Sequence, residues 1–429
     1  MLLHQLPDDV LADIMEWGHL YTLSRTCKHF HLLWHSIFVR VSEDANGFPL
    51  LRQCMTPAMA SGVRSFHYTG ERISWHPLMN FMRPRTVILH ITNWFERWNI
   101  CKLMTWFRPH VERLVLRSAG STAPHHLLTA LCTQLKQAET LRFLEVCIRQ
   151  GHVTDTLFQE LGHTFGQMKQ LRSLCLSVPM NSITVAGLQR FMDGVASLTT
   201  LREVGLDISG NWIRGTQYGK QLSRLVDLHS LRRLHLTFGG WGVRKQFGLE
   251  YLMLLGSHSC LQSLSITIIG ARITCESFKK AMQGIAVLPQ LRELNLDLRS
   301  CDVGDQCHRG LALLRSAKRL ERVSLGLGHP SERLLSVVGA IQHTPNLKEF
   351  TVAIDQRGQV FGVVHANRLA TFSHPFCVVR VTVHNANLIN PETVRTVLNG
   401  GFPSVKTLYV CIFEYSHHAE RILVCRNGI

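Results

Sequence analysis

The chain has no run of about 18 apolar residues, although 45% of its 429 residues are hydrophobic. A transmembrane helix needs about 20 consecutive apolar residues, so no membrane-spanning segment is predicted. The amino terminus is poor in Arg and carries Asp8, Asp9, Asp13 and Glu16, which argues against a secretory signal or a mitochondrial presequence. Only 18% of the residues are charged, so the composition favours a large buried core over a disordered chain.

Cysteine spacings typical of metal sites or disulfide scaffolds are also missing. The 13 cysteines are scattered, with no CxxC motif and no even framework. We therefore expect reduced, packed thiols and a cytoplasmic or nuclear location. Cys301, Cys307 and His308 are the nearest approach to a metal cluster, but no second half of a zinc site is visible. No metal and no cofactor is expected.

Recognisable catalytic motifs are absent as well. The sequence contains no HExxH, no GxSxG and no dinucleotide-binding fingerprint. The segment GTQYGK at 215–220 is one residue short of a P-loop, lacks Ser or Thr after the Lys, and falls in a predicted helix. The carboxylates are few and scattered. These absences predict a protein without enzyme activity.

The sequence does contain a regular repeat. Six-residue stretches with apolar residues at the first, fourth and sixth positions recur, each starting 30 residues after the one before. They are 111–116, 141–146, 171–176, 201–206, 231–236, 261–266 and 291–296. A fixed period of this length predicts stacked strand–helix repeats that share one continuous core.

Less regular copies of the stretch lie on both sides. We assign 63–68 and 86–91 before the regular part, and 320–325, 347–352, 378–383 and 405–410 after it. Apolar stripes between the stretches predict helices, for example over 154–168, 184–198 and 274–288, several of them preceded by a capping Thr or Ser. The last stretch of the chain is expected to cover the open edge of the sheet.

The pattern L-x-x-L-x-L at this spacing resembles the leucine-rich repeat family, in particular its ribonuclease-inhibitor-like branch. The resemblance implies an α/β solenoid with a curved parallel β-sheet on its concave side and helices on its convex side. The family's Asn or Cys a few residues past the strand is missing at most repeats, with Asn211 as a late exception. We therefore expect the usual ladder of buried side-chain amides to be absent.

The segment 6–38 has a different character. Asp8 and Asp9 follow a Leu-Pro pair, as at a helix N-terminus, and an apolar stripe comes next. With Leu23, Cys27, Lys28, Phe30 and Trp34, the segment resembles an F-box, the helical module that binds a Skp-type adaptor of cullin-RING ubiquitin ligases. The resemblance implies that the adaptor-binding residues are Leu6, Pro7, Val10, Leu11 and Ile14.

The spacing of this segment leaves a second interpretation open. The link from Ile14 to Cys27 is about three residues shorter than the family pattern. The alternative to the F-box is the N-terminal helical cap that a repeat array needs, and the two roles are not exclusive. The predicted domains are an F-box-like helical module at 1–41, a connector at 42–62, repeats at 63–410 and a C-terminal cap at 411–429.

Residues that alternate with the buried Leu positions would line the concave face. The third and fifth positions give a mixed polar surface, which suits a protein or peptide ligand. Its candidate partner-binding residues are Arg113, Phe143, Arg233, Glu293, Glu145, His235 and Tyr409.

The second positions are mostly Arg. Because neighbouring strands lie about 4.8 Å apart, these arginines would form a row of like charges. An anionic partner would relieve the repulsion between them. The row contains Arg142, Arg172, Arg202, Arg232 and Arg292, which we also expect to bind the partner of the concave face. The alternative is that Arg is simply common at this position in the family and that acidic neighbours such as Glu203 and Glu293 neutralise it.

Two functions follow from these observations. The leading one is a substrate receptor of a Skp–cullin–F-box ubiquitin ligase, in which residues 6–38 bind the adaptor and the concave face holds an unidentified protein target. The alternative is a structural scaffold in a large assembly such as a ribonucleoprotein. There, the net charge of +16 would serve contacts with RNA or acidic subunits.

Overall fold

The computed structural model describes residues 39–42, 63, 65–70, 82–91, 110–118, 125–149, 153–213, 215–239, 249–299, 301–303, 308–328, 341, 343–355, 378–384, 407–413 and 420–426. The predicted adaptor-binding segment at 6–38 lies outside these residues. The chain forms two compact units. The first comprises Met1–His152 with Gln170–Arg172, and the second comprises Val153–Lys169 with Ser173–Ile429.

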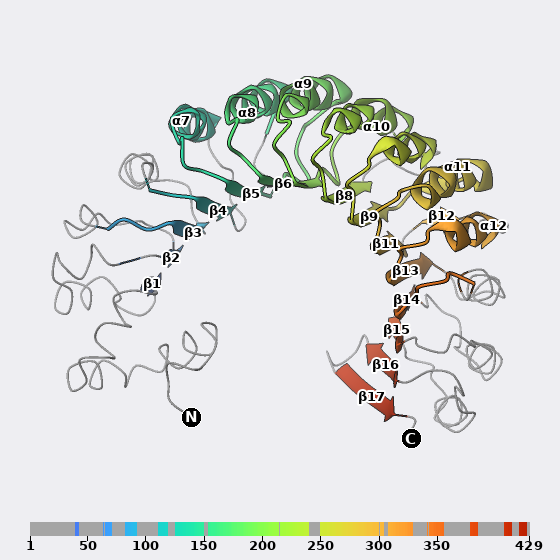
Figure 1. Cartoon of the computed structure of the whole chain (residues 1–429). Helices are drawn as coiled ribbons and strands as arrows, with labels where there is room; N and C mark the ends of the chain where they lie inside the picture. Colours follow the sequence, from blue (N-terminus) through green and yellow to red (C-terminus); the bar gives the residue numbers. More distant parts are fainter. Residues whose placement is uncertain are drawn as a thin grey trace, which may run out of the picture. The chain divides into compact units, whose positions relative to one another are not determined.

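The first unit is a parallel sheet with a helix. Its strands pair in chain order, and α7 (His125–Lys136) connects the last two of them (Figure 1). The strands are β1 (Val39–Ser42), β2 (Ser65–Gly70), β3 (Thr86–Ile91), β4 (Arg113–Ser118) and β5 (Phe143–Ile148). Parallel neighbours need a crossover connection, which the helix supplies between β4 and β5.

The second unit continues the same alternation over a longer parallel sheet. Its strands are β6 (Ser173–Ser177), β7 (Glu203–Asp207), β8 (Arg233–Gly239), β9 (Ser263–Ile269), β11 (Glu293–Leu298), β13 (Arg322–Gly328), β14 (Glu349–Asp355), β15 (Val378–His384) and β16 (Thr407–Phe413). At the end, β17 (Glu420–Arg426) pairs antiparallel with β16. A separate two-stranded sheet joins β10 (Arg272–Ile273) to β12 (Asp302–Val303).

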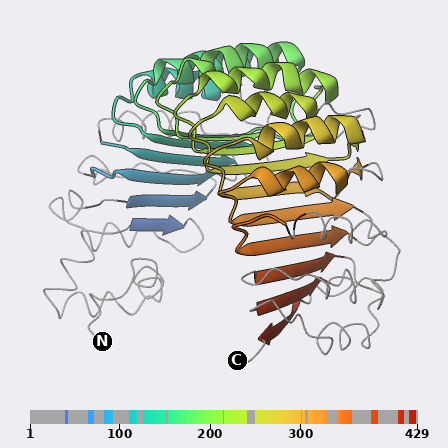
Figure 2. The same ribbon diagram turned by 45° about the vertical axis from the view of Figure 1, so that its right-hand side comes forward.

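The helices of the second unit lie along one side of its sheet (Figure 2). They are α8 (Asp155–Gln167), α9 (Val185–Ala196), α10 (Gly215–Leu222), α11 (Cys275–Ala286) and α12 (His308–Leu311), with 3₁₀ segments η4 (Ser223–Asp227), η5 (Leu249–Ser257) and η6 (Ala312–Ser316). The helices predicted at 154–168, 184–198, 215–220 and 274–288 are confirmed. No helix in the described part of the chain is long and apolar enough to cross a membrane.

The core lies between this sheet and its helices. The described apolar positions of the strands from β6 to β14 are buried, as in the first repeat of the unit with Leu171, Leu174 and Leu176, each at most 2% exposed. Helices α8 and α9 approach to backbone contact, because a Cβ on Gly194 would lie 2.2 Å from the carbonyl oxygen of Gly162. The result is an open α/β arrangement of stacked strand–helix repeats, which is consistent with a solenoid.

Strand pairing corrects the frame of two flanking repeats. Thr86 pairs with Ser65 and with Arg113, so it occupies the third position of its repeat, where we had assigned the first. Val378 pairs with Glu349 and is also a third-position residue. The predicted frames at 86–91 and 378–383 were therefore wrong by two residues. A strand alternates with period two, so a shift of two leaves the same residues on each face and cannot be detected from the pattern.

The expectation that buried amides are absent was also wrong over part of the second unit. Asn211 is 2% exposed, and its Oδ1 accepts a hydrogen bond from the backbone N–H of Ile183 at 3.1 Å. Its Nδ2 donates to the carbonyl oxygens of Val178 at 2.8 Å and Ile208 at 3.0 Å. One side chain thus satisfies three backbone groups in the turns after β6 and β7.

Two other side chains serve the same purpose. Asn181 stands one repeat before Asn211, and its Oδ1 accepts from the N–H of Val153 at 2.9 Å. Cys301 is 5% exposed and donates from Sγ to the carbonyl oxygen of Ile268 at 3.2 Å. Each lies ten residues past the first Leu of its repeat. The Cys301 thiol, which we had considered as a metal ligand, has a structural contact here.

We expect Asn211→Ala to destabilise the second unit by about 2–4 kcal/mol, because a buried backbone group without a partner costs about 1–3 kcal/mol. Urea unfolding followed by circular dichroism measures this loss. Gln262→Ala, at an exposed residue of the same unit, is the control and should change little. Equal stability of the two variants would contradict the structural role of Asn211.

His258 occupies a buried apolar position of the repeat. It is 2% exposed and stands three residues before Leu261, where other repeats have Leu198, Leu228 and Leu288. Burial, together with the nearby His229, lowers its pKa from the ordinary 6.5. The folded protein therefore holds the imidazole neutral, and the unfolded chain takes up a proton first as the pH falls.

His258→Leu should stabilise the protein, by about 1–3 kcal/mol at neutral pH, because it replaces a buried polar group with the residue that neighbouring repeats use. The wild-type protein should lose stability as the pH falls below about 6.5, and the variant should lose less. Urea unfolding at several pH values measures both effects. If the substitution leaves the pH dependence of stability unchanged, groups other than His258 cause that dependence.

Candidate interaction surfaces

The sheet of the second unit has one face away from the helices, which we call the open face (Figure 2). Third, fifth and seventh positions of the strands lie on it and alternate with the buried apolar positions. Over β6 to β11 it carries Ser173, Cys175, Ser177, Glu203, Gly205, Asp207, Arg233, His235, Thr237, Ser263, Ser265, Thr267, Glu293, Asn295 and Asp297. Most of these side chains are short and polar, so the face offers hydrogen-bonding groups close to the sheet.

Carboxylates on the open face are held by neighbouring strands. Ser173 and Ser177 of β6 donate to Glu203 at 3.1 Å and to Asp207 at 3.0 Å on β7. Ser263 of β9 donates to Glu293 of β11 at 3.1 Å. Cross-strand pairs of this kind fix the carboxylates in position.

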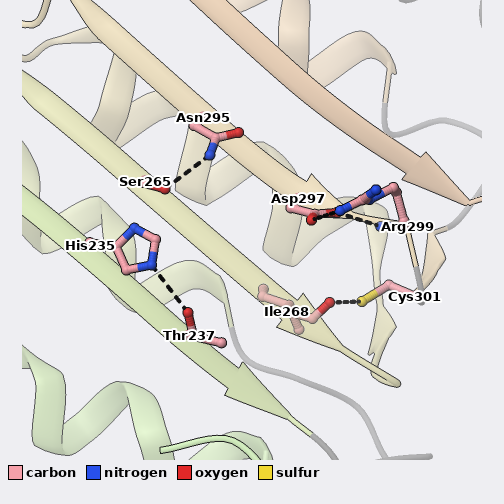
Figure 3. Close-up of polar contacts among 8 residues, drawn as sticks. All are labelled: His235, Thr237, Ser265, Ile268, Asn295, Asp297, Arg299 and Cys301. Atoms are coloured by element: carbon pink, nitrogen blue, oxygen red, sulfur yellow. Dashed lines mark hydrogen bonds and ion pairs between the residues drawn. The ribbon is translucent and has the colours of Figure 1, made fainter. Parts of the chain in front are cut away.

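Part of this polar surface is shown in Figure 3. Asn295 donates to the hydroxyl of Ser265 at 3.0 Å, and the Arg299 guanidinium forms an ion pair with Asp297 at 2.6 Å. His235 lies 3.3 Å from the Thr237 hydroxyl. His235 is exposed and, within the part of the chain that the structure describes, makes only this long contact, so its imidazole is available to a partner.

Several residues predicted for the concave face do lie on the open face. Arg233 and His235 are exposed neighbours on β8, and Glu293 on β11 forms an ion pair with Arg322 of β13. Tyr409 lies in β16, where it pairs with Arg380 of β15. The structure thus spreads these predicted residues along one sheet and does not gather them into a single cluster.

In the first unit, the predicted residues form two adjacent contacts. The Arg113 guanidinium lies 3.9 Å from the centre of the Phe143 ring, a cation–π contact. Glu145 forms an ion pair with Arg117 at 2.7 Å. Arg117 stands at the seventh position of its repeat and was missed because our pattern covered only six positions.

The second-position residues lie beside the strands, in the turn that precedes each one. We call these positions the strand-start row. In the second unit the Arg202 carbonyl oxygen accepts hydrogen bonds from the N–H groups of Arg232 at 2.7 Å and Arg233 at 2.9 Å. In the first unit the Arg142 carbonyl accepts from the N–H of Arg172 at 2.8 Å. Second-position side chains of neighbouring repeats therefore start next to one another, as predicted.

In the described part of the row, the charges are neutralised only where it contains Glu. Glu321 lies 2.8 Å from Lys348 and 3.6 Å from Arg292. The hydrogen bond from Lys348, aided by the positive charges of Lys348 and Arg292, lowers the pKa of the Glu321 carboxyl. In the first unit, Glu112 lies 3.7 Å from Arg85.

The four arginines in a run are not neutralised. Among the described residues, Arg142 and Arg172 of the first unit and Arg202 and Arg232 of the second make no ion pair and no side-chain hydrogen bond. The proposed neutralisation by Glu203 and Glu293 is not seen, because Glu203 accepts from Ser173 and Glu293 pairs with Arg322. These arginines are exposed cations with free guanidinium donors.

Neither surface brings together a metal site in the part of the chain that the structure describes, where no group of three or more His, Cys, Asp or Glu side chains could hold an ion. In comparisons with known proteins, no family model and no curated protein matches this chain. The candidate function therefore depends on the geometry of the surfaces and on the sequence resemblances.

The unpaired arginines should contribute nothing to stability. We expect Arg202→Gln/Arg232→Gln, which copies Gln262 from the next repeat, to leave the free energy of unfolding unchanged or to raise it by up to about 0.5 kcal/mol at low salt. Lys348→Gln, which breaks the pair with Glu321, is the comparison and should lower it slightly. A double variant clearly less stable than wild type would show that these arginines have a structural role.

Proposed function

We propose that this protein is a non-enzymatic interaction module of the leucine-rich repeat type. In this proposal it is the substrate receptor of a Skp–cullin–F-box ubiquitin ligase and holds its protein target on the open face. The observation that supports target binding is the open face itself. It is a continuous sheet surface of short polar side chains that no described helix of the second unit covers.

The charge of the open face favours a protein ligand over a polyanion. Glu203, Asp207, Glu293, Asp297 and Glu349 all stand at its third or seventh positions. A phosphate backbone on this face would meet those carboxylates at close range and be repelled. A polypeptide with mixed or basic side chains can instead accept from Arg233 and donate to the carboxylates.

The adaptor-binding part of the proposal is supported by the F-box resemblance of residues 6–38, with Leu6, Pro7, Val10, Leu11 and Ile14 as contacts. Ubiquitin transfer would then be the work of the partner ligase. This chain would supply only the distance and orientation between target and adaptor.

The second candidate function is a structural scaffold in a large assembly. The unpaired arginines of the strand-start row favour it, because a row of uncompensated cations gains most from an acidic subunit or RNA. The two candidates differ in their partners: a receptor requires an adaptor, and a scaffold does not.

A pull-down from soluble extract, read by mass spectrometry, tests the receptor proposal. We expect the intact chain to capture a Skp-like adaptor and a cullin, and Leu6→Ala/Pro7→Ala/Ile14→Asp to lose both while it retains target proteins. Arg233→Ser/His235→Ser, which copies Ser263 and Ser265 of β9 onto β8, should retain the adaptor and lose at least some targets, because it removes two large, exposed hydrogen-bonding side chains from the open face.

Lys279→Ala/Lys280→Ala on the helix side is the control and should retain both groups of proteins. If the intact chain brings down no adaptor, the receptor proposal fails and residues 1–41 are a cap. A large particle that collapses on RNase treatment would then support the scaffold.

A further inference from the structure

The second unit carries positive charge at the end of the sheet where its strands begin. The second-position residues lie there, together with the other residues of the turns that lead from the helices into the strands. Lys318 and Arg319 occupy the turn before β13 and directly precede buried Leu320, which is followed by the second-position Glu321. We call the following six residues the basic edge: Arg202, Arg232, Arg292, Lys318, Arg319 and Lys348, all of them exposed.

The edge already contains one example of the ligand that it accepts. Glu321 stands in the same row, and its carboxylate lies between Lys348 at 2.8 Å and Arg292 at 3.6 Å. A carboxylate at the second position of a repeat therefore contacts the second-position cations of both neighbouring repeats. Hydrogen bonds between charged groups of this kind are stronger than those between neutral groups.

The part of the edge at β7 and β8 lacks such a carboxylate. Arg202 and Arg232 begin from adjacent turns, joined by the backbone hydrogen bond of 2.7 Å. Among the described residues neither has an ion pair, and exposed Asp227, the nearest carboxylate before Arg232 in the chain, makes none with it. Two like charges on adjacent turns repel each other, and a carboxylate from outside would convert the repulsion into two attractions.

We propose that the basic edge binds an acidic segment of a partner protein, whose Asp or Glu carboxylates lie between Arg202 and Arg232 as Glu321 lies between Arg292 and Lys348. An acidic polypeptide fits better than single-stranded nucleic acid. Nucleic-acid grooves combine cations with aromatic side chains that stack on bases, and the described turn and second-position residues of this edge include no Trp, Tyr or Phe.

This binding site is separate from the open face in both position and charge. The basic edge lies in the turns before the strands, whereas the open face lies on the strands and is rich in carboxylates. An acidic segment would be repelled by the open face and attracted to the edge. The proposal stands whether the chain acts as a ligase receptor or as a scaffold, since it rests on neither adaptor binding nor target capture.

Fluorescence anisotropy with a labelled oligo-glutamate peptide and the full chain tests this proposal. We expect salt-sensitive binding that Arg202→Glu/Arg232→Glu weakens at least about tenfold, because it replaces two attractions with two repulsions. Arg202→Lys/Arg232→Lys keeps the charge and should retain most of the affinity. Wild-type circular dichroism spectra of the variants would show that they remain folded.

The matched control is Lys279→Glu/Arg309→Glu on α11 and α12. It changes the net charge equally at two exposed residues on the helix side and should alter the affinity less than about threefold. An equal loss in this control would show that only net charge matters and would overturn the proposal. Absence of peptide binding at low salt would overturn it too. Tighter binding of oligo-uridine, lost in Arg202→Glu/Arg232→Glu, would identify a nucleic-acid site instead.

Discussion

Burial of the repeat's apolar positions against the helices is the constraint on which the rest of the structure depends. A single strand and its helix expose too much apolar surface to be stable, so each repeat requires its neighbour. Parallel pairing aligns the same positions of successive repeats, as when Leu174 pairs with Val204 and Val204 with Leu234. Alignment of the buried positions necessarily aligns the exposed ones as well. The open face and the strand-start row are therefore consequences of core packing.

This alignment separates two kinds of charge in the second unit. Strand residues such as Glu203 and Glu293 place carboxylates on the open face, where Ser hydroxyls or Arg322 hold them. Turn residues such as Arg202 and Arg232 place cations just before the strands, without compensation among the described residues. The open face thus offers a surface for a polypeptide with mixed or basic side chains. The strand-start row, one residue earlier in each repeat, offers a surface for an acidic polypeptide.

Stacking of the repeats also determines how the backbone N–H and C=O groups in the turns after the strands find hydrogen-bond partners. Asn181 and Asn211 each reach a backbone N–H of the preceding repeat, and Cys301 reaches a carbonyl oxygen in the same way. These side chains are spaced ten residues past the first Leu, a regularity visible in the sequence only once the position is known. Repeats without such a residue there, for example the one with Ala271, satisfy their turns differently. From the sequence only Asn211 was recognised at this position, and the contacts of Asn181 and Cys301 became visible only in the structure.

The sequence by itself determined the strand–helix alternation, the helix positions and the faces of the strands, because a 30-residue period and a period of two are properties of the residue order. It could not determine the register of irregular repeats. For β3 and β15 a shift of two preserves every face, and only the hydrogen-bonded partners of Thr86 and Val378 distinguish the alternatives. Tertiary structure alone also decided which charges are neutralised. Pairing depends on side-chain distances between repeats, and these left Glu321 enclosed by cations but Arg202 and Arg232 free.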